Sequence, residues 1–456
     1  MTDEQWPSPR RAWYSVAIFA LALTMNFLDR GIVGLLVEPI KRDLALSDFQ
    51  ISLIIGFAFS CMYLVLGLPI ARLVDVASRR LIIGAGIATW SAATALCGLA
   101  QNFLQLFVAR VGVGIGEACN GPATFSMMAD LFPPRRLPRA IAVLNFGFVA
   151  GLGLSLLMGG VVIHYLGTLP PVELPVVGEL RDWQMTFVAV GVPGLVVAVL
   201  LATVPEPKRR GLLSAGVGAN VQGKPKSIPL AEVGRFLLDN RRAYAPMFLG
   251  VAVNTVLAFG HQAWYAAFFS RTYGWSASQF ALVFGSIILV GAPVMLIVGS
   301  RLAEWYAQKG YHDANMRVTL IAAILVMPGA IGFAFMPTPE LAVAVISFNF
   351  CVAMLSPGPQ NAALQIITPN QMRGQVTALF LFVFNIIGFG LGATVVATIT
   401  DYVIGDELQL RYSLALTSAI LGPLAILIFW WGLKPYAHAV ERAEMRYAAE
   451  GVPAGG

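Results

Sequence analysis

The chain has 456 residues, of which 57% are hydrophobic and only 12% carry a formal charge. A mean hydropathy of +0.74 over this length excludes an ordinary soluble core and indicates a polytopic membrane protein. The net charge of +6 could suggest a nucleic-acid partner, so the positions of the basic residues have to be considered.

Twelve apolar segments are long enough to cross a bilayer as helices, since roughly 20 residues span the hydrocarbon core. The N-terminus leads into the first of these segments, which lacks a small-residue cleavage site, so we expect it to be kept as a helix. The predicted spans of the first half are residues 13–36, 49–71, 81–100, 104–128, 138–165 and 184–203. Those of the second half are 245–270, 277–300, 317–336, 340–366, 374–400 and 412–433. The sequence therefore predicts an all-α membrane protein.

The basic residues are distributed unevenly between the two sides of the predicted membrane. With the N-terminus inside, the cytoplasmic segments hold 23 of the 30 Lys and Arg residues and the opposite side holds five. Topology thus explains the positive charge, and no nucleic-acid partner is expected. We predict a multi-pass protein of the inner (plasma) membrane with both termini in the cytoplasm.

The longest polar connection separates six spans from six. It runs from Glu206 to Arg242, and Pro229 within it can begin a short amphipathic helix that lies on the membrane surface. The predicted organisation is an N-terminal six-helix bundle (1–203), a cytoplasmic linker (204–242), a C-terminal six-helix bundle (243–433) and a cytoplasmic tail (434–456).

The two halves resemble one another when the sequence is shifted by 237 residues. The superposed pairs are Gly121 with Gly358, Pro122 with Pro359, Arg136 with Arg373, Gly151 with Gly388 and Gly153 with Gly390. Duplicated six-helix halves are typical of secondary transporters, whose substrate site lies between the halves near the bilayer midplane. Glycine runs such as GVGIG fall inside spans, so they indicate close helix packing and not phosphate binding.

Several stretches resemble a known family. The loop GLPIARLVDVASRR resembles the charged signature of the major facilitator superfamily, and RVGVGIGEA is similar to its arginine-and-glycine signature. More narrowly, NFLDR, GIGEACNGPA and RGQVTALFLFVFNIIGFGLG resemble the Spinster branch. The resemblance covers nearly the whole chain and implies twelve helices in two pseudo-symmetric halves. It also implies that Asp75, Arg79 and Arg80 close the cytoplasmic side, and that the substrate is an amphiphile such as a lysophospholipid or sphingolipid.

Three charged residues lie clearly at bilayer depth: Asp29, Arg110 and Glu117. A charge there costs several kcal/mol, so these side chains are expected to face the protein interior or a water-filled cavity. Arg110 and Glu117 share one helix face about 10 Å apart along the axis. We predict that Asp29 and Glu117 carry protons. Burial raises the pKa of a carboxyl group and a nearby cation lowers it, so such a group can change protonation as water enters or leaves. Arg110 would hold a polar or anionic head. A purely structural Arg110–Glu117 ion pair, or a structural Asp29, remains an alternative.

Arg30 lies about 100° around the helix from Asp29, so the two cannot point the same way. It is either a gate residue facing the cavity or an interhelical contact, and we group it with the gating residues Asp75, Arg79 and Arg80. The second half offers polar side chains but no mid-span acid. Among them we expect His261 and Asn361 to bind substrate, although a hydrogen-bonded interior histidine is an alternative.

The favoured interpretation is a monomeric, proton-coupled carrier that moves a lipid-like amphiphile by alternating access. No cofactor or metal is expected, because the four cysteines show no ligand spacing and the proton gradient would supply the energy. One alternative is a carrier of small organic anions or drugs. Another is an intramembrane lipid-modifying enzyme, although the sequence lacks His-Glu-x-x-His, Gly-x-Ser-x-Gly and paired catalytic aspartates. A receptor or scaffold would leave the three buried charges unexplained.

Overall fold

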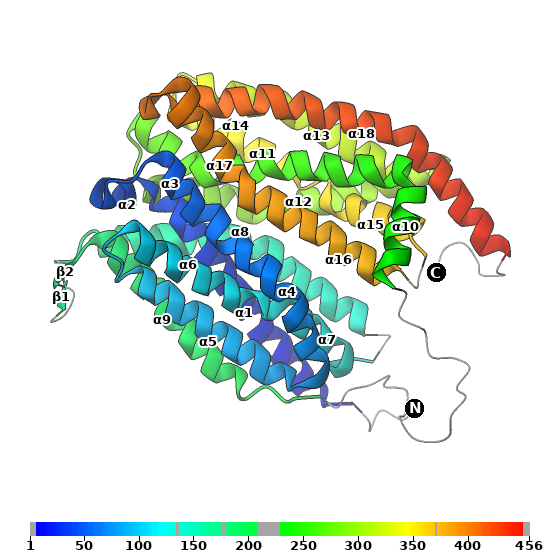
Figure 1. Cartoon of the computed structure of the whole chain (residues 1–456), viewed down its shortest axis with the longest axis horizontal. Helices are drawn as coiled ribbons and strands as arrows, with labels where there is room; N and C mark the ends of the chain where they lie inside the picture. The colour runs from blue at the N-terminus through cyan, green and yellow to red at the C-terminus, as the bar shows by residue number, and fades with distance from the viewer. Residues whose placement is uncertain are drawn as a thin grey trace. The chain divides into compact units, whose positions relative to one another are not determined.

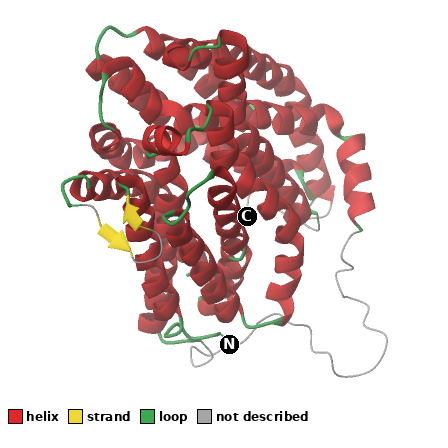
Figure 2. Ribbon diagram, turned by 60° about the vertical axis from the view of Figure 1, so that its left-hand side comes forward, coloured by secondary structure: helices red, strands yellow, loops and turns green. Residues whose placement is uncertain are grey.

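A computed structural model describes residues 6–133, 136–170, 172–174, 178–207, 229–369 and 372–449. These residues form helices almost throughout, with one short pair of strands (Figure 2). The chain divides into two compact units. Unit 1 combines Met1–Gly211, Gly260–Val290 and Phe389–Ser413, and unit 2 combines Leu212–Phe259, Gly291–Gly388 and Leu414–Gly456.

Unit 1 contains all the predicted spans of the first half and two segments from the second. Figure 1 labels the helices. Its first helices are α1 (Pro9–Leu35), α2 (Val37–Leu44), α3 (Asp48–Ser52), the π-helical turn η2 (Leu53–Phe57), α4 (Ala58–Val76) and α5 (Arg79–Cys97). They are followed by α6 (Phe103–Ala118), α7 (Asn120–Leu131), α8 (Leu137–Leu166) and α9 (Asp182–Leu201). From the second half come α17 (Leu391–Thr398), the π-helical turn η5 (Ile399–Ile404) and the 3-10 turn η6 (Glu407–Gln409).

Unit 2 is built from the remaining helices. Within it lie α10 (Leu230–Asp239), α13 (Ala314–Gly332), the 3-10 turn η3 (Phe333–Phe335), α14 (Pro339–Ala353), α15 (Pro357–Ile367) and α16 (Arg373–Val383). Four helical segments contain a boundary between the units: α11 (Arg241–Tyr273), α12 (Ala277–Gln308), the π-helical turn η4 (Phe384–Gly390) and α18 (Leu410–Ala449).

The predicted spans are found as helices. Among the described residues, nine helical stretches are long and apolar enough to cross a membrane, and Asp48–Met62 and Gly151–Leu166 are shorter apolar helices. The predicted span 104–128 is interrupted by a turn at Cys119, which separates α6 from α7. The all-helical polytopic fold predicted from the sequence is therefore confirmed.

Two local features differ from the sequence expectation. A short antiparallel hairpin, β1 (Val172–Leu174) paired with β2 (Gly178–Leu180), follows α8 and was not predicted. The helix expected after Pro229 is present as α10, and its apolar side packs on the protein: Val233 belongs to a core cluster of unit 2, and Phe236 packs against it. Linker residues 208–228 lie outside the described residues, and the predicted domain boundaries stay a prediction.

Glycines let the helices around α6 approach closely, as the sequence predicts. A Cβ on Gly116 would lie 2.5 Å from the backbone nitrogen of Trp90 on α5, and one on Gly114 would lie 2.6 Å from the carbonyl oxygen of Phe59 on α4. Close backbone contact of this kind is typical of membrane helices. It holds α6 firmly between α4 and α5, and α6 carries Arg110 and Glu117.

Candidate functional site

Four charged side chains from two helices gather inside unit 1. Asp29 and Arg30 lie on α1, and Arg110 and Glu117 lie on α6. Asp29, Arg110 and Glu117 are each at most 2% exposed. Together with Arg30 they form the buried charge cluster, which contains two acids and two arginines.

Arg30 is the ionic partner of Glu117. Its Nε donates to Oε2 of Glu117 at 2.6 Å, and the Glu117 side chain is fully buried. This bond is an interhelical contact, one of the two roles considered for Arg30, and a gating role stays a prediction. The ion pair between Arg110 and Glu117 that was considered as an alternative is absent from the ion pairs of the described residues. Two positions seven apart on one helix are too far separated to pair, whereas Arg30 reaches Glu117 from α1.

Arg110 connects the cluster to the backbone of α1. Its Nη1 donates to the carbonyl oxygen of Asp29 at 3.3 Å, and Arg110 and Glu117 are the charged neighbours of the Asp29 carboxyl group. Among the described side chains, three atoms of the cluster are buried without a hydrogen-bond partner: Oδ1 of Asp29, Nε of Arg110 and Oε1 of Glu117. Buried polar atoms are normally satisfied, so the two carboxyl oxygens can bind a proton, water or a polar substrate group, and the Nε–H of Arg110 can donate to water or substrate.

Two aromatic rings cover Arg30. Its guanidinium carbon lies 4.4 Å from the ring centroid of Phe59 and 5.5 Å from that of Phe389. The two ring centroids are 5.7 Å apart. Both aromatic residues belong to unit 1, although Phe389 comes from the second half of the sequence. Sequence reasoning did not identify either ring.

The two polar residues predicted in the second half lie in different units. His261, on α11 in unit 1, is 3% exposed, and its ring lies 5.9 Å from that of Tyr265. Asn361, on α15 in unit 2, is exposed and donates its side-chain amide to the carbonyl oxygen of Pro357 at 2.9 Å. Their roles in substrate binding remain predictions.

The predicted gating arginines are anchored at the start of α5. Arg79 is 1% exposed and pairs with Asp130 of α7 and with Glu206, whose Oε1 lies 3.1 Å from Nε of Arg79. Arg80 donates to the carbonyl oxygens of Ala202 and Val204 at 3.2 and 3.3 Å. The side chain of Asp75 lies outside the described residues. No sequence signal identifies Asp130 or Glu206, because both pairings depend on tertiary packing.

Glu206 caps the N-terminus of α5 with its carboxylate. It accepts the backbone N–H of Arg80 at 2.8 Å and that of Arg79 at 3.3 Å, and the hydroxyl of Ser78 at 2.8 Å. Partial burial acts to raise the pKa of Glu206. The N–H of Arg80, the Ser78 hydroxyl and the Arg79 guanidinium outweigh it and hold this pKa below its ordinary value.

A second ionic network lies at another part of unit 1 and was also missed. Asp48 of α3 accepts from Lys41 at 2.5 Å and from two nitrogens of Arg271 at 2.7 and 2.8 Å. Arg271 also pairs with Glu38 at 2.7 Å, and Lys41 pairs with Glu407. We call these five residues the Asp48 network. It joins the first half of the sequence to the end of α11 and to η6.

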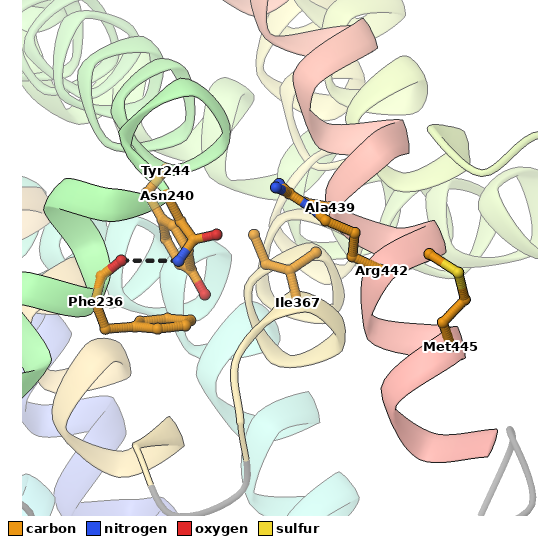
Figure 3. A pocket seen from close by; sticks show the side chains of 7 residues that line it. All are labelled: Phe236, Asn240, Tyr244, Ile367, Ala439, Arg442 and Met445. Carbon is orange, nitrogen blue, oxygen red and sulfur yellow. Dashed lines mark hydrogen bonds between the residues drawn. The ribbon is translucent and has the colours of Figure 1, made fainter. Parts of the chain in front are cut away.

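Unit 2 contains a cavity of about 460 Å³ near the start of α11 and the last turns of α18 (Figure 3). Its lining is mostly apolar, and the amide of Asn240 donates to the carbonyl oxygen of Phe236 at 2.9 Å. The lining residues are Phe236, Asn240, Tyr244, Ile367, Ala439, Arg442 and Met445. None of them was predicted as a site residue, and none belongs to the buried charge cluster.

A family model described as the Major Facilitator Superfamily matches residues 19–393. The chain belongs to this superfamily. The resemblance seen in the sequence motifs is confirmed at this level, and the protein is a multi-pass member of a family of membrane transporters.

Curated relatives and solved structures agree with that assignment. An MFS-type efflux pump of Mycolicibacterium smegmatis is 28% identical over 425 residues, which cover 92% of each chain. A probable L-galactonate transporter of Escherichia coli is 26% identical over 314 residues, covering 68% of this chain and 65% of that protein.

The fold is similar to that of a bacterial homologue of the human lysosomal transporter Spinster, solved inward-facing and unoccupied. The TM-score is 0.76 at 22% identity, covering 96% of this chain and 99% of that one. A D-xylose–proton symporter matches with a TM-score of 0.66 at 16% identity, covering 94% and 99%. The Spinster-like fold expected from the sequence is therefore present.

Proposed function

We propose that the protein is a proton-coupled secondary transporter of a lipid-like amphiphile, in the inner membrane with both termini in the cytoplasm. The observation that carries the proposal is the buried charge cluster: two carboxyl groups and two arginines inside an apolar helical bundle, with polar atoms left unpartnered. Ionisable groups at membrane depth are expensive, and they typically mark ion or substrate pathways.

The charge balance of the cluster suggests how a proton and a substrate could be linked. With Asp29 and Glu117 both ionised, the two acids offset the two arginines. Protonation of either acid leaves one guanidinium uncompensated, and that guanidinium can bind a phosphate or carboxylate head. In this scheme Asp29 and Glu117 carry the protons, Arg110 holds the head group, and His261 and Asn361 supply further hydrogen bonds. Arg30 pairs with Glu117 whenever Glu117 is ionised.

The amphiphilic substrate class rests on the Spinster-like sequence motifs, since relatives with those motifs are associated with lysophospholipids and sphingolipids. The apolar composition of the second half, which has polar side chains but no mid-span acid, suits an acyl chain. We infer that the second half provides most of the apolar wall.

A second candidate function is transport of drugs or small organic anions. The similarity to an MFS-type efflux pump over 92% of each chain favours a drug-like substrate, and the similarity to a probable L-galactonate transporter favours an organic acid. Both alternatives would use the same charge cluster.

The test is flux into proteoliposomes with and without a pH gradient, using labelled lysophosphatidylcholine, sphingosine phosphate, a cationic dye and galacturonate. We expect a lysolipid or sphingolipid to move faster than the dye and the sugar acid. Transport of the sugar acid or dye alone would favour the second candidate.

The coupling residues are tested in the same assay with Asp29→Asn and Glu117→Gln. Each should abolish acceleration by the pH gradient, because each removes one protonatable group from the cluster. Glu340→Gln is the matched control, since Glu340 is an exposed acid in the first turn of α14. Wild-type gradient dependence in both cluster variants would show that the coupling residues lie elsewhere.

A further inference from the structure

The end of one π-helical turn touches another beside the buried charge cluster. η2 comes from the first half of the sequence, and the last residues of η4, Phe389 and Gly390, come from the second. A Cβ on Gly56 in η2 would lie 3.1 Å from the carbonyl oxygen of Gly390 and closer still to that of Phe389. π-Helical turns are rare and are frequently found at functional sites. Here they bring two sequence-distant backbones into direct contact.

Arg30 lies against both sides of this contact. Phe59 follows η2 by two residues and Phe389 belongs to η4, and Arg30 lies over both rings. Phe59 is 1% exposed and the Arg30 side chain is 16% exposed, so the interaction is largely shielded from water. A guanidinium over an aromatic face is attracted by the ring, and more strongly when water is excluded. One cation thus binds a carboxylate and two rings at once.

We propose that Phe59 and Phe389 form an aromatic clamp on Arg30, through which the charge on Glu117 controls the contact between η2 and the end of η4. While Glu117 is ionised, its bond to Nε of Arg30 fixes the guanidinium against both rings. When Glu117 is neutral, that charge-assisted bond is lost, the guanidinium can turn away, and the rings lose their shared partner. Phe389 is then a positioning residue that transmits the state of the cluster to a segment from the other half of the chain.

The clamp rests on the proposed transport function and extends it. Arg30 would link the charge on Glu117 to the contact between η2 and the end of η4. Glu117 has three charged neighbours: Arg30 and Asp29 on α1, and Arg110 on α6. Arg30 lies over Phe59 and Phe389 and also bonds to Glu117, whereas Arg110 donates to the backbone of Asp29. The signal therefore passes through Arg30 and not through Arg110.

Hydrogen–deuterium exchange on the purified full-length protein tests the clamp without any substrate. The peptides to follow cover residues 53–62 and 385–394. Phe389→Leu and Glu117→Gln should each accelerate their amide exchange by roughly three- to thirty-fold, the range expected when a cation–π interaction that limits local opening is lost. The double variant should exchange no faster than the faster single variant, because both changes break one pathway.

Two further variants separate the clamp from a general packing defect. Phe389→Tyr keeps an aromatic face and should retain wild-type exchange. Phe382→Leu removes a ring that is 45% exposed, shortly before η4, and should leave both peptides unchanged. Wild-type exchange in Glu117→Gln or Phe389→Leu, or additive effects in the double variant, would overturn the clamp. Because no transport is measured, these outcomes are independent of whether the proposed substrate and coupling are correct.

Discussion

Arg110 holds the electrostatic balance of the buried charge cluster, and its removal should be costly. It is 1% exposed, and its Nη1 donates to the backbone of Asp29. Arg110→Leu leaves two buried acids with Arg30 as the remaining cation of the cluster. Removing one partner of a buried charged group typically costs about 3–5 kcal/mol. We expect a loss of that size in the free energy of unfolding, measured by denaturant titration in detergent micelles.

The free energy of unfolding of the double variant, Asp29→Asn with Arg110→Leu, shows whether charge imbalance causes the loss of stability in Arg110→Leu. The double variant again contains one acid and one arginine, so most of the lost stability should return. Arg110→Lys, which keeps the charge, should lose less than Arg110→Leu. A double variant as unstable as Arg110→Leu would show that packing of the long side chain, and not its charge, matters.

Glu206 should make stability depend on pH near the start of α5. Its pKa is below the ordinary value in the folded protein, so its contribution is present above the unfolded-state pKa of about 4.3 and is lost as pH falls through the folded-state pKa. Because the side chain is partly exposed, we expect Glu206→Gln to cost less than about 1 kcal/mol at pH 7. Thermal unfolding should show this difference at pH 7 and little difference at pH 3. An equal difference at both pH values would contradict the carboxylate cap.

At the scale of residues, the sequence reveals which charges matter but not how they pair. Asp29, Arg110 and Glu117 are recognisable because a charge inside an apolar run is visible in one dimension. The pairing of Arg30 with Glu117 depends on how α1 is rotated against α6, and nothing local fixes that rotation. The Phe59 and Phe389 rings were missed for a related reason: aromatic residues in apolar helices are ordinary until their neighbours are known.

Glycine sites on the helices should tolerate substitution very differently. A Cβ on Gly116 would meet the backbone of Trp90 and Gly86, so α5 and α6 must move apart to accept it. We expect Gly116→Ala to cost about 1–3 kcal/mol in unfolding free energy, as overpacking does. A Cβ on Gly31 of α1 would have no neighbour within 4 Å, so Gly31→Ala should be neutral or stabilise by up to about 1 kcal/mol.

Thermal melting of the two glycine variants in the same detergent compares them directly. Both changes add one methyl group to a helix, so intrinsic helix propensity favours them equally. A lower melting temperature in Gly116→Ala alone is the expected result. Equal behaviour would mean that the helices around α6 can separate at little cost.

At the scale of elements, the apolar spans were predictable because length and hydropathy decide them. The offset of the repeat is also preserved: α7 begins at Asn120 and α15 at Pro357. The break at Cys119 and the hairpin after α8 were not predictable in the same way. A single turn residue within an apolar run has no hydropathy signal, and a three-residue strand pair is too short for a periodic pattern.

At the scale of the whole molecule, the compact units do not coincide with the two halves of the sequence. Unit 1 includes Gly260–Val290 and Phe389–Ser413 from the second half. The sequence repeat reflects duplication of a six-helix half, whereas the two units reflect which segments are in contact. The Asp48 network accounts for part of this difference, because its ion pairs join α2 and α3 to Arg271 and Glu407.

The Asp48 network should therefore hold these segments of unit 1 together. Asp48 is fully buried and accepts from Lys41 and Arg271, so Asp48→Asn leaves two buried cations without their shared carboxylate. Such a change should separate η6 from the α2–α3 turn. Double electron–electron resonance between spin labels at two exposed positions, Arg42 and Leu408, can measure that separation. The labels are attached to cysteines introduced there, after the four native cysteines have been replaced by alanine.

The variant should show a longer and broader distance distribution than the parent. Glu173→Gln, which neutralises an exposed acid on β1, should leave the distribution unchanged. Raising the salt concentration from 0.1 to 1 M shortens the screening length from about 10 to 3 Å, yet it should have less effect than Asp48→Asn because buried pairs are poorly screened. If salt alone separated the labels as far as the substitution does, η6 would be held by solvent-exposed ion pairs that salt can screen, and not by the buried network. An unchanged distribution in Asp48→Asn would show instead that apolar contacts hold η6, since the ion pairs would then follow the packing of α3 against α17 and not determine it.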